Sequence, residues 1–255
     1  MLLPMREKIL VGTILLYLVL LLLNPITGCE SPRNRIPPEL PSFRTFTCSF
    51  PAGAKSQKGV LIGDLLLKVT NTLLSTIEAI TSTATGPVRS GTSWIWNSSL
   101  PKADFIITGT LAGKGYNWDV TINGTFEPFG LFKNTTGLDG SSNFERDQYS
   151  FDIFDPNAAL KGIIDYSDKY GTLSLDSKIY SLFFSNVTFE TRLIIEEDQA
   201  GSGTLKAYWD NEHIWEADSM FLNLEWWNDQ QNGTWETFYN AELNIPSITD
   251  EGGSW

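Results

Sequence analysis

The chain contains few of the residues that build covalent or metal-centred sites. Its 255 residues include two cysteines, Cys29 and Cys48, and one histidine, His213. Two cysteines cannot form a disulfide framework, and a single histidine without cysteine partners makes a poor transition-metal site. The sequence also lacks a Gly-x-Ser-x-Gly nucleophile elbow, a Walker loop and a dinucleotide fingerprint. We therefore predict no metal, no cofactor and no enzymatic activity.

Positive charge is also scarce. The 18 lysines and arginines are outnumbered by 30 aspartates and glutamates, which gives a formal net charge of −12. This negative charge repels nucleic acid and anionic lipid head groups. The basic residues are scattered and form no stripe that would attract them locally. Nucleic-acid binding is excluded on this basis, and attachment to a membrane needs a lipid rather than charge.

An apolar run stands close to the N-terminus. Arg6 and Lys8 precede 15 mostly apolar residues, Ile9 to Leu23. A membrane-spanning helix needs about 20 such residues, whereas the apolar region of a signal peptide has about 7–15. Residues 1–28 are therefore predicted to be an export signal peptide that is removed from the mature protein.

The stretch Ile26-Thr27-Gly28-Cys29 resembles the lipobox of bacterial lipoproteins, although the resemblance covers only the signal. In that family the motif directs diacylglycerol onto the cysteine, so the resemblance implies that Cys29 is the lipidated mature N-terminus and anchors the protein to a membrane. It also implies a place in the cell envelope. This is the outer membrane if the source is Gram-negative, because Glu30 is not the retaining aspartate, and the outer face of the plasma membrane if it is Gram-positive. A plain N-terminal anchor and an ordinary cleaved signal are the alternatives.

Residues 29–59 are predicted to form a tether between the lipid and the domain. This segment holds five of the chain's 12 prolines, namely Pro32, Pro37, Pro38, Pro41 and Pro51. Proline fixes the backbone angle φ and removes a hydrogen-bond donor, which favours an extended spacer. Three phenylalanines, Phe43, Phe46 and Phe50, indicate that the second half of the tether docks on the domain. Cys48 lacks catalytic neighbours and is interpreted as a structural thiol.

Residues 60–85 are predicted to form one long amphipathic helix that ends at Gly86-Pro87. Its apolar positions recur every three or four residues, at Ile62, Leu66, Val69, Leu73, Ile77, Ile80 and Ala84. We expect the middle of this face, Leu66 to Leu73, to pack against the rest of the domain. A helix that lies on a membrane surface is the alternative, but the polar face lacks the Lys and Arg enrichment of such helices.

Residues 91–240 are predicted to form an antiparallel β-meander, and residues 241–255 a C-terminal tail. The apolar period changes from about 3.6 to 2 after Gly91, and roughly ten alternating stretches follow, which include a hairpin around Gly113-Lys114-Gly115. No second helix interrupts them, which excludes the crossovers of a parallel sheet. The fold class is therefore mainly β, a curved or barrel-like sheet packed against one N-terminal helix. We expect the helix to contact a set of apolar strand residues: Trp94, Phe105, Ile107, Trp118, Val120, Phe151, Phe189 and Leu205.

Several side-chain groups could suggest chemistry. Acidic groups occur at Asp152/Asp155, Glu196/Glu197/Asp198 and Asp210/Glu212, but neighbours along a strand point to opposite faces and do not oppose each other across a cleft. The Asp139-x-Ser141-x-Asn143 segment imitates the start of a calcium loop but lacks the later glycine and glutamate. Most of the nine tryptophans fall on the apolar phase of the strands. Trp227 and Trp255 are the two that we expect to be exposed.

These observations predict an exported, lipid-anchored, non-catalytic protein. A curved sheet with one apolar face favours binding or carrying a small apolar ligand. The sequence departs from the lipocalins, whose first strand carries Gly-x-Trp, because here the segment reads Gly91-Thr92-Ser93-Trp94 and a long helix comes first. The alternative is a surface-adhesion, carbohydrate-binding or structural protein of the envelope. The ligand-binding residues are not predicted.

Overall fold

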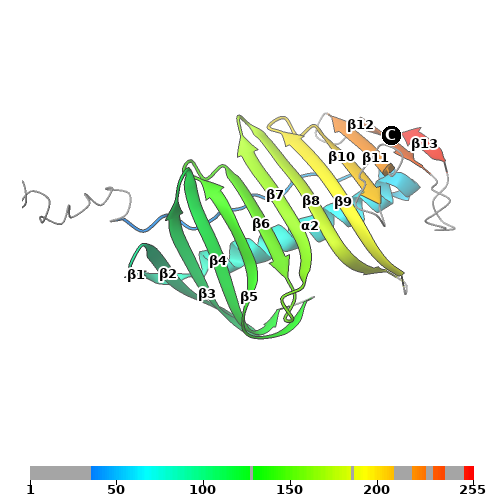
Figure 1. Ribbon diagram of the computed structural model, residues 1–255. Coiled ribbons are helices and arrows are strands. Elements are labelled where there is room, and N and C mark those ends of the chain that lie inside the picture. The colour runs from blue at the N-terminus through cyan, green and yellow to red at the C-terminus, as the bar shows by residue number, and fades with distance from the viewer. Residues whose placement is uncertain (1–35, 127–128, 185–186, 210–219, 228–231, 239–249) are drawn as a thin grey trace, which may run out of the picture. The chain divides into compact units, whose positions relative to one another are not determined.

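The computed structural model describes residues 36–126, 129–184, 187–209, 220–227, 232–238 and 250–255. The signal peptide and Cys29 lie outside these residues, as do Asp210, Glu212 and His213. Residues 38–255 form one compact unit. In its described residues, thirteen strands form a single antiparallel sheet in which each strand pairs with the next along the chain (Figure 1). The predicted mainly β meander with one helix is therefore confirmed.

A short 3-10 helix, η2 (Ala54–Ser56), precedes the long helix α2 (Lys58–Ser82). The strands are β1 (Thr85–Ser90), β2 (Ser93–Leu100), β3 (Ala103–Ala112), β4 (Gly115–Phe126), β5 (Gly130–Asn143), β6 (Gln148–Phe154), β7 (Leu160–Lys169), β8 (Thr172–Phe184), β9 (Val187–Asp198), β10 (Gly203–Trp209), β11 (Met220–Trp227), β12 (Asn232–Thr237) and β13 (Glu251–Ser254). The sheet thus begins before residue 91, and the predicted tail supplies a last strand.

Each strand buries one face and leaves the other partly in solvent. In β3, Phe105 and Ile107 are almost fully buried, whereas Asp104 and Ile106 between them are exposed. This alternation is what an antiparallel sheet with one covered face requires. β3 and β4 form the predicted hairpin, with Ala112 paired to Gly115. The sheet does not close, since its first and last strands do not pair, so it is curved and not a barrel.

Helix α2 lies along the apolar face of the sheet, shown in cyan behind the strands in Figure 1. Its first turns approach β11 and β12, and its end approaches β2, where the Thr83 and Ser98 hydroxyls are hydrogen-bonded at 2.7 Å. By length and composition alone the helix could also cross a membrane, a property that core helices share. Its contacts with the sheet confirm that α2 packs on the domain.

The predicted apolar seam of α2 is wrong in its first half. Val69, placed in the middle of that seam, is 47% exposed, whereas Leu67 and Leu74 are almost fully buried. The buried positions are Gly59, Val60, Gly63, Asp64, Leu67, Thr70, Leu74, Ile77 and Ile80. From Gly63 to Leu74 the buried seam lies one residue later than predicted, and from Ile77 it agrees with the prediction. One residue corresponds to a turn of roughly 100° about the helix axis.

Two glycines explain this rotation. A Cβ atom on Gly59 would lie 2.2 Å from Cε3 of Trp235, and one on Gly63 would lie 2.5 Å from Cδ2 of Leu224. The helix therefore comes close to β11 and β12 along a face that has no side chains at these two positions. Asp64, which is 8% exposed on the same face, is compensated by Lys55 and Lys68, whose Nζ atoms lie at 3.1 and 2.6 Å from its oxygens. Burial opposes ionisation of Asp64, but these two lysines lower its pKa.

Most of the predicted strand residues belong to the core. Buried members of the set are Phe105, Ile107, Trp118, Val120, Phe151 and Leu205, and Trp94 is partly buried against them. The Phe189 side chain lies outside the described part of the chain. Phe43, Phe46 and Phe50 of the tether also belong to this core. Their position makes the second half of the tether part of the folded domain.

Candidate functional site

An extended segment, residues 42–50, lies between α2 and the middle strands of the sheet; we call it the strap. Its backbone is held by side chains on both sides. On the helix side, the Phe43 N–H donates to Glu78 Oε2 at 2.7 Å. The amide of Asn71 bonds Phe46 twice, accepting from its N–H and donating to its C=O, both at 2.9 Å. The strap thus satisfies several of its backbone groups through side chains, without joining the sheet as a strand.

On the sheet side, the strap is held by Tyr166 of β7 and Glu197 of β9. The Arg44 N–H donates to the Tyr166 hydroxyl at 2.8 Å. Glu197 accepts from the N–H groups of Thr47 and Cys48 at 3.0 and 3.1 Å, and from the Thr47 hydroxyl at 2.7 Å. Burial raises the pKa of Tyr166 to about 12, although its bond with Arg44 acts the other way. Each of these contacts joins segments more than 100 residues apart in the sequence.

The phenylalanines of the strap fill the space between the helix and the sheet. The Phe43 ring lies 5.0 Å from the Tyr149 ring and 5.1 Å from the Tyr166 ring, measured between centroids. Phe50 makes an edge contact with Trp226 at 5.8 Å and with Trp255 at 5.6 Å. Phe43, Phe46 and Phe50 are each no more than 5% exposed. The interior of the curved sheet is therefore occupied by the chain's own aromatic side chains.

Glu197 is the central polar group of this contact. It is only 5% exposed, and a carboxylate at such a depth needs hydrogen-bond donors to offset the loss of water. The strap supplies them. The same arrangement raises the pKa of the Cys48 thiol, through burial first and the negative charges of Glu197 and Asp64 second. Cys48 is a free, partly buried cysteine.

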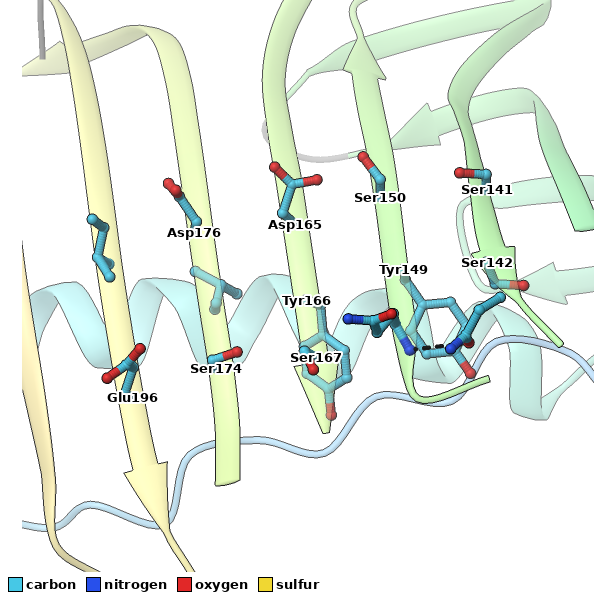
Figure 2. A pocket seen from close by; sticks show the side chains of 14 residues that line it. Ser141, Ser142, Tyr149, Ser150, Asp165, Tyr166, Ser167, Ser174, Asp176 and Glu196 are labelled. Carbon is cyan, nitrogen blue, oxygen red and sulfur yellow. Dashed lines mark hydrogen bonds between the residues drawn. The ribbon is translucent and has the colours of Figure 1, made fainter. Parts of the chain in front are cut away.

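The opposite face of the sheet carries a shallow polar groove of about 470 Å³ across β5 to β9. Figure 2 shows its side chains in two rows. One row contains Ser141, Ser150, Asp165 and Asp176, which are cross-strand neighbours in that order, and the other contains Ser167, Ser174 and Glu196. The serine side chains are too short to fill the space above the sheet, so a groove remains, and the carboxylates make it acidic.

Charges on this groove are partly unbalanced. Arg192 bonds Asp176 with two nitrogens, at 2.9 and 2.5 Å, and this pairing raises the pKa of Arg192. Next to the groove, two residues from Ser141 and Ser150 on the same strands, Asp139 and Asp152 stand directly opposite each other on β5 and β6. Burial and then the charges of Asp139 and Asp165 raise the pKa of Asp152. Like charges side by side on a sheet destabilise it, so this face of the sheet, with Asp165 and Glu196 in the groove itself, favours a cationic or hydrogen-bonding ligand.

A second hollow of about 330 Å³ adjoins the groove and shares Glu196 with it. It lies at one end of β9 to β11 and is lined by Thr204, Glu225 and Trp227 among others. Trp227 is 40% exposed, as predicted. The prediction for Trp255 was wrong, because its ring is only partly exposed and packs on Phe50 and Gly233. A residue's place at the end of the chain did not reveal that it would be covered.

The other predicted groups are separated by the fold. Glu196 faces the groove and Glu197 faces the strap, so these neighbours point to opposite faces of β9. Asp155 binds the backbone of its own turn and pairs with Lys161 at 3.4 Å. Asp139, Ser141 and Asn143 lie within strand β5 and not in a loop. In the described part of the chain, no group of three or more His, Cys, Asp or Glu residues could hold a metal ion.

The sequence patterns did not identify the strap contacts. Glu197, Asn71 and Glu78 looked like ordinary polar residues of a strand and a helix, and only their burial against the strap distinguishes them. The one available signal was the spacing of three phenylalanines in a proline-rich segment.

A scan against protein-family models, a search of the curated proteins and a search of the solved structures each found no match for this chain.

Proposed function

We propose that this protein is an exported, lipid-anchored, non-catalytic carrier that binds a small apolar ligand between α2 and the middle strands of the sheet. In this proposal the strap occupies the ligand's place when no ligand is bound. The observation that carries it is the arrangement of the strap. Its phenylalanines are buried in the apolar interior, yet its backbone is held by side-chain hydrogen bonds and not by pairing in the sheet.

Such a segment is suited to exchange with a ligand. An apolar ligand that replaces Phe43 and Phe46 keeps the apolar contacts of the interior, so much of the hydrophobic stabilisation is retained. When the strap moves out, its own polar groups bond to water, and Glu197, Asn71 and Glu78 need partners from water or from a polar head group of the ligand. Displacing a paired strand would break the backbone hydrogen bonds to its neighbours on both sides. The strap pairs with no strand, so its departure leaves the sheet intact.

The predicted anchor would keep this exchange close to a membrane. Cys29 precedes Ser42 by 13 residues. At about 3.3–3.6 Å per residue, a fully extended chain of this length spans roughly 45 Å. A lipidated Cys29 therefore holds the strap within that distance of the bilayer, where apolar ligands are concentrated. A membrane-derived acyl chain is the ligand class that fits this placement.

Ligand binding can be tested with a fluorescent polyene fatty acid and the double variant Phe43→Ala/Phe46→Ala. Removing both rings weakens the strap as a competitor, so the variant is expected to bind the probe at least tenfold more tightly than the wild type. Unlabelled saturated fatty acids should displace the probe from both proteins. Fluorescence titration measures the two dissociation constants.

Phe132→Ala is the matched control for this experiment. Phe132 is 1% exposed in β5, and its ring contacts Phe126, away from the strap. This variant should lose stability without gaining affinity for the probe. Equal gains in both variants would mean that the probe senses loosened packing. Absence of saturable binding in the wild type and the double variant would reject the carrier and favour a structural role in the envelope.

Lipid attachment is tested separately. Intact-mass measurement of protein extracted from the membranes of its host should show a chain that begins at Cys29 and carries a diacylglycerol group. Cys29→Ser should abolish the added mass and release the protein into the soluble fraction. An unmodified mature wild-type chain in the soluble fraction would instead identify an ordinary cleaved signal.

A further inference from the structure

The hollow at the end of β9 to β11 has features that the carrier function does not use. Glu196, Thr204 and Glu225 are cross-strand neighbours on the outer face, and Trp227 follows Glu225 on the same face. The strap lies on the other side of the sheet, bonded to Glu197. A ligand in this hollow would therefore not compete with the strap for space.

Trp227 offers a flat apolar surface within a polar surrounding. It is 40% exposed, whereas its neighbour Trp226 is 1% exposed. An indole ring next to hydrogen-bonding side chains combines apolar contact with polar recognition. The apolar C–H face of a pyranose ring packs against such a surface, and its hydroxyl groups reach the polar side chains around it.

The neighbouring Trp226 lies on the other face of β11, where its ring meets Phe50 of the strap at 5.8 Å. Its ring lies over Gly203, where a Cβ atom would come within 2.6 Å of Cζ2. The Nε1–H of Trp226 is buried and has no hydrogen-bond partner in the described structure. A buried donor without a partner is costly, and such groups are rare in folded proteins. This donor faces the interior beside the strap, so a ligand on the outer face does not reach it, and Trp227 is the indole that such a ligand meets.

The remaining lining is acidic and rich in hydroxyl groups. The carboxylates are Glu196, Glu197, Asp198 and Glu225, and the lining contains no Lys, Arg or His. Of these, Glu197 is occupied by the strap, and Asp198 accepts from the backbone of its own turn. Glu196 and Glu225 are thus placed to accept from the hydroxyl or ammonium groups of a ligand.

From these contacts we infer a carbohydrate-binding subsite, in which a sugar ring stacks on Trp227 and bonds to Glu196, Thr204 and Glu225. The negative charge makes sugars that carry a free amino group the preferred ligands. The serine-lined groove shares Glu196 and continues the polar surface across β8 to β5. Since neighbouring strands are about 4.8 Å apart, this surface can accommodate several linked sugar units.

The inference is tested by isothermal titration with three sets of oligosaccharides: glucosamine oligomers, their N-acetylated forms and glucose oligomers. The expected order of affinity is glucosamine first, with the two neutral sets at least fivefold weaker but measurable. Trp227→Ala should weaken all three by tenfold or more, and Trp227→Phe should restore part of the loss. Leu131→Ala, which removes a 58% exposed side chain from β5, is the matched control and should bind like the wild type.

Glu225→Gln separates charge from shape. It should abolish the preference for glucosamine oligomers while leaving the binding of the glucose oligomers within about twofold of the wild type. Thermal melting checks that each variant is folded. Binding of glucosamine oligomers alone, if matched by tetramethylammonium and abolished by high salt, would replace the sugar subsite with a simple organic-cation site. Binding that is unchanged in Trp227→Ala, or no binding to any of the sets, would also overturn the inference.

Discussion

Replacing Leu74 by alanine is expected to lower the free energy of unfolding by about 2–5 kcal/mol. Leu74 has no exposed surface and lies in the buried seam of α2, so its removal costs both apolar burial and a residual cavity. Typical domains are stable by only about 5–15 kcal/mol, which makes this a large fraction of the total. Urea unfolding in lipid-free buffer, followed by far-ultraviolet circular dichroism, gives the midpoints.

Leu65→Ala is the matched control. It removes the same side chain from the same helix, but Leu65 is 49% exposed, so the expected loss is within about 0.5 kcal/mol. The pair tests the orientation of α2 as well as its packing. If Leu65→Ala were the more damaging change, the buried seam would lie on the other side of the helix. Unchanged midpoints for both variants would revive a helix that lies on a membrane surface.

Replacing Glu197 by alanine is expected to release the strap. The change leaves the Thr47 and Cys48 N–H groups without their acceptor, and hydrogen bonds to a buried charge contribute about 1.5–3 kcal/mol each. We expect unfolding to become easier by about 2–3 kcal/mol and alkylation of Cys48 to accelerate at least tenfold. The rate is measured with iodoacetamide in a Cys29→Ser background, where Cys48 is the single thiol.

The raised pKa of the Cys48 thiol determines the pH at which the assay is run. A free cysteine ionises near pH 8.5, whereas burial and the charge of Glu197 raise the pKa of Cys48 in the docked strap. At pH 8.5 the docked thiol is therefore protonated and slow, and a released one is about half thiolate. Because the pKa is higher in the folded protein, this group's contribution to stability is complete below pH 8.5 and declines as the pH rises above it.

Glu196→Ala serves as the control for Glu197. The two residues are adjacent, but Glu196 points to the outer face of β9 and makes no bond to the strap. Its removal should leave the alkylation of Cys48 unchanged. Acceleration by both changes would indicate general loosening of β9, and acceleration by neither would show that the strap does not depend on Glu197.

Local patterns were sufficient for the elements of this fold. The alternation of Phe105 and Ile107 with Asp104 and Ile106 predicts a strand wherever the chain is placed, because side chains of a strand point alternately to two faces. The single long helical pattern similarly predicted α2. Strand β1 was missed because Thr85–Ser90 is exposed throughout and carries no alternation, and β13 was missed for the same reason.

Relations between distant segments could not be predicted in this way. The turn of α2 about its axis depends on Gly59 and Gly63 meeting Trp235 and Leu224, more than 150 residues later. The helix is apolar over much of its circumference, so its sequence allows several seams, and close packing selects one. The partner of each side chain is a property of the assembled core.

The sequence by itself therefore determined the class of the fold and the identity of its elements, because hydrophobic period and turn chemistry act over a few residues. Only the tertiary structure decided which face of α2 is buried, that Phe43, Phe46 and Phe50 fill the interior, and that Glu197 holds the strap while Glu196 faces the groove. The physical reason is that burial and hydrogen bonding are pairwise. A carboxylate becomes a docking point only when the fold removes its water and brings it a donor.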